Sequence, residues 1–281
     1  MQKVILAWIG AIIFIGFVTN SVNALPVGLV SYWQFDENNG TTLNDSLGSN
    51  DGQIFEASWT SGLVGSALQF DGINDIVNLP NISGYSDFTM AAWFKPNNIG
   101  DSLGIFQTGM GYIRIEENIS YPTGVYYLIT EDRAGGSGNR YDFRYNYDLL
   151  PEDLYNRWHY AVLTGNSDNS DLSAYLDGNL VGNLSWKHSG WSSTLNYTVI
   201  GALKASLWSN NNEGAYFAGL IDEVYQFNRA LSAEEVSIYY QSGLQGRTLY
   251  DPIPEPTTML LLGPGLLGLL GIWRWGLKRR S

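Results

Sequence analysis

Between residues 25 and 243 the sequence is a succession of short aromatic and β-branched runs separated by Gly, Asn, Asp and Ser. The clearest run is 141–148, where Tyr or Phe at every second position alternates with a polar residue. A period of two places the rings on one face of a strand. Many short strands with turn residues between them predict an all-β sandwich or barrel. Further strands are expected at 30–35, 66–70, 88–94, 124–130, 157–163, 172–176 and 197–200.

A single helical signature interrupts this pattern near the end of the region. Ser232 has the character of an N-cap, and Glu235 follows three residues later, as in a capping box. Gly243 ends the pattern. We expect this short helix to cover an edge or corner of the sandwich. Its apolar stripe consists of Val236, Tyr239 and Tyr240.

The first 24 residues have the organisation of a secretory signal peptide. Lys3 precedes an apolar run over 4–18, and small residues lead to a cleavage site after Ala24. The alternative is an uncleaved N-terminal anchor, although the run is short for a helical span of about 20 residues. Both interpretations place the rest of the chain outside the cytoplasm.

The other end of the chain has the features of a membrane tail. After a linker at 244–253 comes the triplet Pro254, Glu255 and Pro256, followed by an almost wholly apolar segment at 257–273. This segment is near the lower length limit of a transmembrane helix, and basic residues after it favour the cytoplasmic side. The basic residues are Arg274, Lys278, Arg279 and Arg280.

Segment 254–281, with its triplet, its short apolar helix and its basic cluster, resembles the PEP-CTERM sorting signal of Gram-negative bacteria. The resemblance implies processing by an exosortase, a membrane enzyme similar to transpeptidases. The protein would be anchored in the inner membrane before processing and would reach the cell surface or extracellular matrix afterwards. A plain C-terminal membrane anchor is the alternative.

Charge and cysteine content narrow the classes of function. Five of the 15 basic residues and one of the 27 acidic residues lie in the two end segments, which leaves 10 and 26 and a net charge of −16 between them. A surface this acidic repels phosphate backbones, which argues against nucleic-acid binding and favours cations. The chain has no cysteine, so disulfides and thiol catalysis are excluded.

Six segments between the two ends carry a family resemblance: VSYWQFDENNGTTLNDSLGSNDG, SGLVGSALQFDGINDIVNLP, DFTMAAWFKP, RWHYAVLTG, LSAYLDGNLVG and FAGLIDEVYQFNRALSAEEV. They occur in the order found in LamG-like, or concanavalin A-like, jelly rolls of bacterial surface proteins. The resemblance covers nearly all of 25–243. It implies two antiparallel sheets packed face to face, with the first and last strands adjacent.

Calcium is the cofactor that this resemblance implies, as a structural ion. In LamG-like domains calcium often lies where the first strand, the FDG turn and the final IDE strand meet, and carboxylate oxygens are suitable ligands. The alternative is that the same side chains shape turns or accept hydrogen bonds from backbone amides. The candidates are Asp36, Asp71, Asp75 and Asp222.

Carbohydrate is the second expected ligand. A sugar site needs exposed aromatic rings beside Asn, Asp and Gln. Trp186, Trp191 and Trp208 lie in segments rich in Ser and Asn that are typical of loops. The alternative is that these indoles pack beneath the loops as part of a satellite core.

Catalysis is not expected. A retaining glycosidase needs two carboxylates about 5 Å apart, and neighbouring residues on a strand point to opposite faces. No Gly-x-Ser-x-Gly motif occurs. Of the two histidines, His159 is expected to pack in a strand, and His188 lies in the tryptophan-rich segment. The adjacent acidic pairs are Glu116–Glu117, Asp222–Glu223 and Glu234–Glu235.

These features favour a non-catalytic, exported surface or extracellular-matrix protein. The expected activity is binding of exopolysaccharide, adhesion or a role in biofilm. Two alternatives stay open: a divergent glycosidase or lyase on the same fold, and a purely structural surface component without a small ligand.

Overall fold

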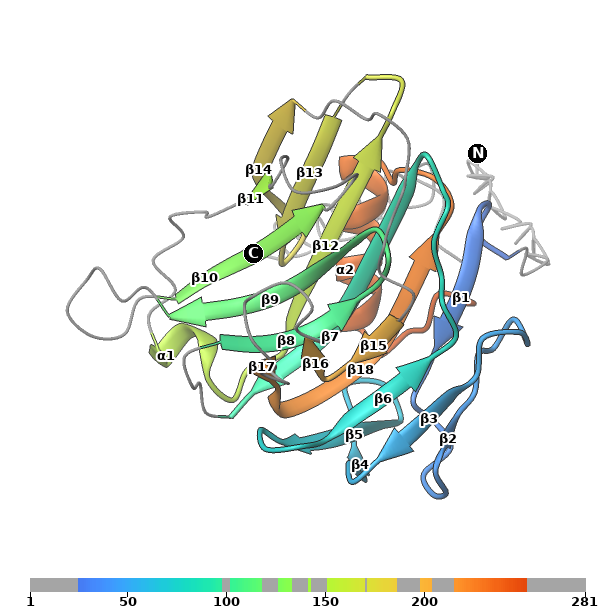
Figure 1. Cartoon of the computed structure of the whole chain (residues 1–281), viewed down its shortest axis with the longest axis vertical. Helices are drawn as coiled ribbons and strands as arrows, with labels where there is room; N and C mark the ends of the chain where they lie inside the picture. The colour runs from blue at the N-terminus through green and yellow to red at the C-terminus, as the bar shows by residue number, and fades with distance from the viewer. Residues whose placement is uncertain are drawn as a thin grey trace, which may run out of the picture.

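The strands form two large sheets in the computed structural model, which describes residues 25–97, 102–117, 126–132, 141–142, 151–169, 171–185, 198–203 and 215–251. Within these ranges there are two eight-stranded sheets and one two-stranded sheet (Figure 1), and neighbouring strands pair antiparallel. The segments 1–24 and 252–281, which hold the predicted signal peptide and sorting tail, lie outside the described residues.

The first sheet has the order β14-β13-β12-β7-β18-β5-β4, and β1 also pairs with β18. The first and last strands are therefore adjacent, as expected. The bounds are β14 Asn179–Ser185, β13 Asp171–Leu176, β12 His159–Asn166, β7 Phe88–Pro96, β18 Ala218–Phe227, β5 Ser66–Asp71, β4 Ser58–Ser61 and β1 Leu29–Trp33.

The second sheet has the order β11-β10-β9-β8-β15-β6-β3-β2, and the two-stranded sheet joins β16 to β17. The bounds are β11 Tyr141–Asp142, β10 Tyr126–Asp132, β9 Gly111–Glu117, β8 Ser102–Gln107, β15 Thr198–Ile200, β6 Ile76–Leu79, β3 Gly52–Phe55, β2 Thr42–Leu43, β16 Ala202–Leu203 and β17 Ala215–Tyr216.

The main hydrophobic core lies between the two large sheets. Alternate residues of the strands point to opposite faces, so Met90 and Phe94 of β7 and Ile113 and Ile115 of β9 enter the same buried cluster. The prediction of a two-sheet antiparallel sandwich is confirmed. The predicted strand at 141–148 is described only at 141–142, where it is a strand; 143–148 lie outside the described residues.

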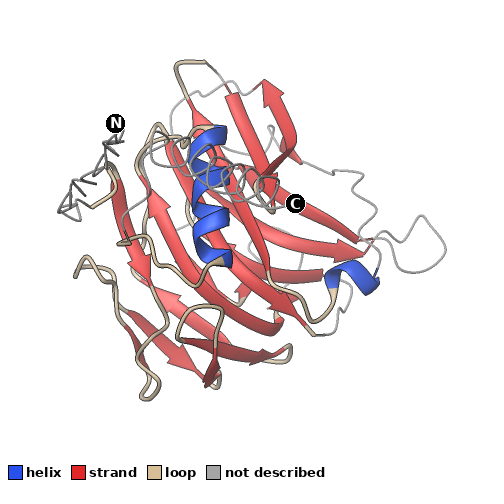
Figure 2. Cartoon of the chain, turned by 180° about the vertical axis from the view of Figure 1, so that it is seen from behind, coloured by secondary structure: helices blue, strands red, loops and turns tan. Residues whose placement is uncertain are grey.

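Helix α2 (Ala233–Leu244) lies across the outward face of the first sheet, as Figure 2 shows. Val236 and Tyr239 pack there on Tyr32, Trp93 and other aromatic residues. The expectation that the helix covers an edge or corner is therefore wrong. The reason is that the central strands of this sheet are apolar on both faces, so their outward face also has to be removed from water. Helix α1 (Pro151–Leu154) is a single turn.

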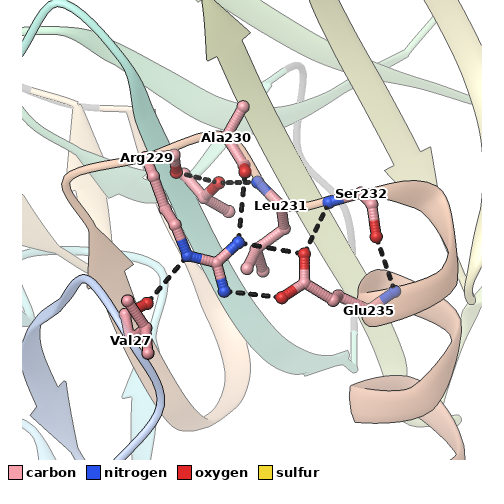
Figure 3. Close-up of polar contacts among 7 residues, drawn as sticks. Val27, Arg229, Ala230, Leu231, Ser232 and Glu235 are labelled. Atoms are coloured by element: carbon pink, nitrogen blue, oxygen red, sulfur yellow. Dashed lines mark hydrogen bonds and ion pairs between the residues drawn. The ribbon is translucent and has the colours of Figure 1, made fainter.

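The first turn of α2 is fixed by the predicted capping box and by an arginine (Figure 3). Ser232 Oγ accepts a hydrogen bond from Glu235 N at 3.2 Å, and the Glu235 carboxylate accepts from Ser232 N at 2.9 Å. Arg229 donates two hydrogen bonds to the same carboxylate and one from Nε to the Val27 carbonyl at 2.7 Å. The residues after the predicted signal peptide are thereby held to the helix.

Among the described residues, no helix has the length and apolar character required to cross a membrane.

Candidate functional site

The four candidate calcium ligands fall into two pairs. One pair shapes the turn after β5: Asp71 Oδ1 accepts from Ile73 N, and Asp75 Oδ2 accepts from Asp71 N, both at 2.7 Å. Asp75 is buried and Asp71 is exposed. Burial raises the pKa of Asp75, and the hydrogen bond from the Asp71 amide opposes the rise.

The other pair, Asp36 and Asp222, holds the turn that joins β4 to β5. Asp36 Oδ1 accepts from Ser66 N at 2.9 Å. Asp222 Oδ2 accepts from the amides of residues 63 and 64 at 2.8 and 3.1 Å. Gly65 has a φ of +60°, and a Cβ there would lie 1.9 Å from Asp36 Oδ1. Only glycine lets this turn approach the carboxylate so closely.

This geometry matches the hydrogen-bonding alternative better than a calcium site. In the part of the chain that the structure describes, no three His, Cys, Asp or Glu side chains are grouped so that they could hold a metal ion. Each of the four carboxylates instead accepts from a backbone amide. In this structure the four carboxylates therefore act as hydrogen-bond acceptors for backbone amides, and calcium stays a prediction.

Asp222 and Glu223 form a buried acidic pair in the middle of β18. The ladder to β7 shifts register between Asp222 and Tyr225, and Glu223 has a φ of 50°. This bulge sends the two side chains to different neighbours. Asp222 contacts the β4–β5 turn, whereas Glu223 Oε2 accepts a hydrogen bond from the Tyr32 hydroxyl.

Burial governs the ionisation of both acids. It raises the pKa of Asp222 to about 8, against the opposing effect of backbone amides that donate to it. Burial, followed by the charge of Asp222, raises the pKa of Glu223 well above its usual range. Raised pKa values are frequent in active sites. Here, however, the exposed fractions are 0% for Asp222 and 3% for Glu223, so a glycan cannot reach this pair.

His159 is a packed strand residue, as predicted. Its ring lies beside Phe94, with centroids 5.7 Å apart. Nδ1 is 2.8 Å from Asp177 Oδ2, and Nε2 is 3.2 Å from the Leu154 carbonyl. Both nitrogens are occupied by structural partners. His188, the other histidine, lies outside the described residues.

The outward face of the second sheet carries a continuous row of side chains, most of them polar. This face is turned to the viewer in Figure 1. Each residue of the row lies directly opposite the next one, which belongs to the neighbouring strand. The adjacent residues in each strand, such as Ile54, Val77 and Ile113, point into the core. From β2 to β9 the row is Thr42, Gln53, Asn78, Val199, Gln107 and Tyr112.

One end of this row is covered. Tyr112 packs with Leu203 of β16 and Ala215 of β17 in a small third cluster. The cover is close, because a Cβ on Gly104 of β8 would lie 2.5 Å from the backbone of β16. Arg114, which is buried, lies over the Tyr112 ring, with Cζ 5.5 Å from its centroid.

The other end is open. Thr42 and Gln53 are exposed, and Asn78 is half-buried. Phe55, two residues after Gln53 and on the same face, is 45% exposed. We call Thr42, Gln53, Phe55 and Asn78 the open row. It combines amide and hydroxyl groups with an exposed aromatic ring, which is the chemistry of a sugar subsite.

The open row was not predicted from the sequence. The predicted sugar site consists of Trp186, Trp191 and Trp208, which lie outside the described residues, so that site stays a prediction. A local signal was present, since Ile54 lies between Gln53 and Phe55 in β3, and Ile113 and Ile115 alternate with more polar residues in β9. The register that aligns these strands is not local, and without it the row cannot be recognised.

The fold and the sequence together define a class: an all-β sandwich of the jelly-roll type joined to a sorting tail. The family model described as the concanavalin A-like lectin/glucanases superfamily matches residues 71–237, and the PEP-CTERM protein-sorting motif matches residues 252–280. The chain belongs to the concanavalin A-like lectin/glucanase superfamily and carries a PEP-CTERM sorting motif. No curated protein matches the sequence.

Solved structures share the fold at low sequence identity. Domain 4 of an extracellular arabinanase from Geobacillus stearothermophilus, in complex with arabinotriose, has a TM-score of 0.53 at 18% identity, covering 74% of this chain and 96% of that one. The binding domain of botulinum neurotoxin serotype D has a TM-score of 0.55 at 15% identity, covering 79% of this chain and 53% of that one. A Trypanosoma rangeli sialidase has a TM-score of 0.54 at 17% identity, covering 80% of this chain and 34% of that one.

Proposed function

We propose that the protein is a non-catalytic, exported carbohydrate-binding protein of the cell surface or extracellular matrix, and that exopolysaccharide binds at the open row. The observation that carries this proposal is the alignment of exposed amide, hydroxyl and aromatic side chains on one face of the second sheet. Superfamily membership supports it, and so does the printed description of the arabinanase domain as a complex with arabinotriose.

The chemistry of the open row suits a neutral sugar. Amide side chains can donate to and accept from ring hydroxyls, and Phe55 can pack against the apolar face of a pyranose. The open row contains no charged residue. Since the domain has a net charge of −16, it repels strongly anionic polymers at long range.

Binding is tested with residues 25–251, which contain both large hydrophobic clusters, and a panel of bacterial polysaccharides in affinity electrophoresis or calorimetry. The double variant Gln53→Ala/Phe55→Ala should weaken binding at least about tenfold, equivalent to about 1.4 kcal/mol. The matched control is Leu180→Ala, which removes an exposed apolar side chain from β14 of the other sheet and should leave binding unchanged.

The same assay separates the open row from the predicted tryptophan site. Loss of binding in Trp186→Ala, Trp191→Ala or Trp208→Ala, with normal binding in the double variant, would place the ligand at the tryptophans. If no polysaccharide binds, the purely structural surface component becomes the better interpretation. Release of reducing sugar by the wild-type domain would instead establish the glycan-active enzyme.

Sorting through the tail is the second part of the proposal. The PEP-CTERM motif implies processing by an exosortase, with inner-membrane anchorage before processing and release to the surface or matrix afterwards. Glu255→Ala in the full chain should leave the tail attached and the protein in the membrane fraction. A variant that is processed and distributed like the wild type would contradict this role of the triplet.

Calcium is retained as a proposed structural ion that can be tested directly. An ion present at 100 times its dissociation constant adds about 2.7 kcal/mol of stability. Thermal unfolding of residues 25–251 should therefore shift to higher temperature with calcium relative to chelator, and Asp71→Asn should remove the shift if this aspartate is a ligand. Identical melting curves with calcium and chelator would end the proposal.

A further inference from the structure

A single Asn-Gly pair occurs in the sequence, Asn39–Gly40, and it lies in the bend that leads into β2. The backbone nitrogen of a glycine can attack the side chain of a preceding asparagine, because glycine has no side chain to shield it and adopts conformations that other residues rarely reach. Both residues are exposed, and Gly40 has a φ of +82°. The pair therefore combines access to water with backbone freedom.

Little in the fold restrains the two groups that would react. A Cβ on Gly40 would meet nothing within 4 Å, so this side of the bend is not packed against the domain. Among the described residues, Gly40 N has no hydrogen-bond partner. The Asn39 side chain makes one hydrogen bond, from Nδ2 to the Glu37 carbonyl at 3.2 Å, and this bond is exposed. Water can replace such a bond at little cost.

We propose that Asn39 deamidates spontaneously through a cyclic imide and that the reaction alters the edge of the open row. The Gly40 nitrogen loses its proton to water and bonds to Asn39 Cγ, and the side-chain nitrogen leaves as ammonia. Water then opens the ring. Attack of water at Cγ gives aspartate, and attack at the main-chain carbonyl carbon gives isoaspartate. The net change converts an amide and water into a carboxylate and ammonium.

The modified position lies next to the open row, at the edge of the second sheet formed by β2 (Figure 1). Ile54 N of β3 donates to the Thr41 carbonyl at 2.8 Å, and Gln53 Nε2 donates to the same carbonyl at 2.7 Å. Continuing the antiparallel register of β2 and β3 by one residue places Gly40 next to Phe55. The reaction therefore occurs beside the aromatic ring of the proposed sugar site.

Isoaspartate changes both the shape and the charge of this edge. In isoaspartate the main chain runs through the former side chain, which adds one methylene group directly before β2, a strand of only two residues. The shift also strains the hydrogen bond from Trp59 Nε1 to the Gly40 carbonyl, which is 2.9 Å long. A free carboxylate appears beside a row that has no charged residue. Weaker polysaccharide binding should follow, and this consequence rests on the proposed function, whereas the deamidation does not.

The test follows Asn39 in the full chain, purified in detergent and incubated at neutral pH, by peptide mapping with mass spectrometry. The mass gain of the amide-to-acid change should accumulate at Asn39 at least about tenfold faster than at Asn38, which is also exposed but precedes another asparagine. A synthetic peptide with the sequence of 36–43 gives the rate without the fold. The folded chain should react within about tenfold of the peptide, a barrier difference below about 1.4 kcal/mol.

Two variants test the chemistry of the pair. Asn39→Gln lengthens the side chain and disfavours ring closure, so it should abolish the product. Gly40→Ala shields the attacking nitrogen and should slow the reaction at least about tenfold. The matched control is Gly84→Ala, at another exposed glycine with a positive φ of +91° and open space around it, and it should leave the rate at Asn39 unchanged.

The outcomes separate the modification from the proposed function. A folded chain that reacts more than about tenfold more slowly than the peptide overturns the proposal, because the fold then protects the pair. Equal rates at Asn38 and Asn39 overturn it as well. After incubation, the wild type should bind polysaccharide about threefold more weakly than Asn39→Gln treated in parallel. Equal binding overturns the effect on the open row, and a chain that deamidates but never binds polysaccharide refutes the proposed function and leaves the modification.

Discussion

The outward faces of the two sheets differ in chemistry and in what covers them. On the first sheet, Trp93, Tyr160 and Tyr225 lie beneath α2, and Trp93 stacks on Tyr240 of the helix with centroids 5.5 Å apart. On the second sheet the outward face carries amides and hydroxyls, and its β2–β3–β6 end is open. The first face is a second core, whereas the open end of the second face can stay in water.

This difference suggests a division of roles. An aromatic face has to be covered to contribute to stability, since its rings bury large areas. An exposed row of amides needs no such cover, because polar groups at a surface can hydrogen-bond to water or, in the proposed function, to sugar hydroxyls. Substitutions on the two faces should therefore affect different measurements: unfolding for the first face and binding for the second.

Removal of the indole beneath α2 should have the largest effect on stability. Trp93 is 2% exposed and packs on Tyr160, Tyr240 and Gly243. Trp93→Ala should lower the free energy of unfolding by about 3–5 kcal/mol, because it leaves a large cavity. Urea unfolding measures this loss. A change below about 1 kcal/mol would show that the first face is no core at all.

A dependence of stability on pH should come next, because the acidic pair lies in the first sheet. The pKa of Asp222 is raised to about 8 and that of Glu223 is also raised. The folded state therefore retains protons that the unfolded chain releases. Stability should be greatest in mild acid and fall by on the order of 1 kcal/mol per pH unit between about pH 5 and pH 8.

Glu235 contributes with the opposite sign, because the hydrogen bond from Arg229 lowers its pKa. The stabilisation from Glu235 is lost only as the pH falls below the pKa that this residue has in the unfolded chain, and that range lies below the window of pH 5 to 8. Urea unfolding at about pH 5 and about pH 7.5 measures the slope. Glu223→Gln should flatten it, and Glu234→Gln, an exposed acid in the first turn of α2, should not. A free energy of unfolding that rises between about pH 5 and pH 8 would refute the claim that Asp222 and Glu223 retain protons in the folded state.

Local features of the chain could be predicted from the sequence, whereas features that depend on how distant strands align could not. The capping box of α2 was predictable because Ser232 and Glu235 lie within one helical turn. The position of α2 was not, since it depends on rings from β1, β7, β12 and β18 that meet only in the folded sheet. The open row was missed for a similar reason: Thr42, Gln53 and Asn78 become neighbours only through the register of three strands.

Weakening the attachment of the helical cover should cost less than removing the core beneath it. Ser232→Ala removes the acceptor for Glu235 N and should lower the free energy of unfolding by about 1 kcal/mol. Ser237→Ala, at an exposed position within the same helix, is the control and should be neutral or slightly stabilising, because alanine is the better helix former. A loss equal to that of Trp93→Ala would mean that the cap, and not the aromatic face, fixes the helix.

The smallest effect on stability should accompany a clear effect on binding. Phe55 is 45% exposed, so Phe55→Ala should change the free energy of unfolding by less than about 1 kcal/mol. The same change removes the ring on which a sugar would stack, and it should weaken polysaccharide binding about threefold to tenfold, equivalent to about 0.6 to 1.4 kcal/mol. Thermal melts and polysaccharide-binding curves, recorded for the wild type and for Phe55→Ala, measure both effects. A variant that loses stability and keeps its affinity would show that Phe55 belongs to the packing of the second sheet, and the contrast between a face for stability and a face for binding would no longer hold.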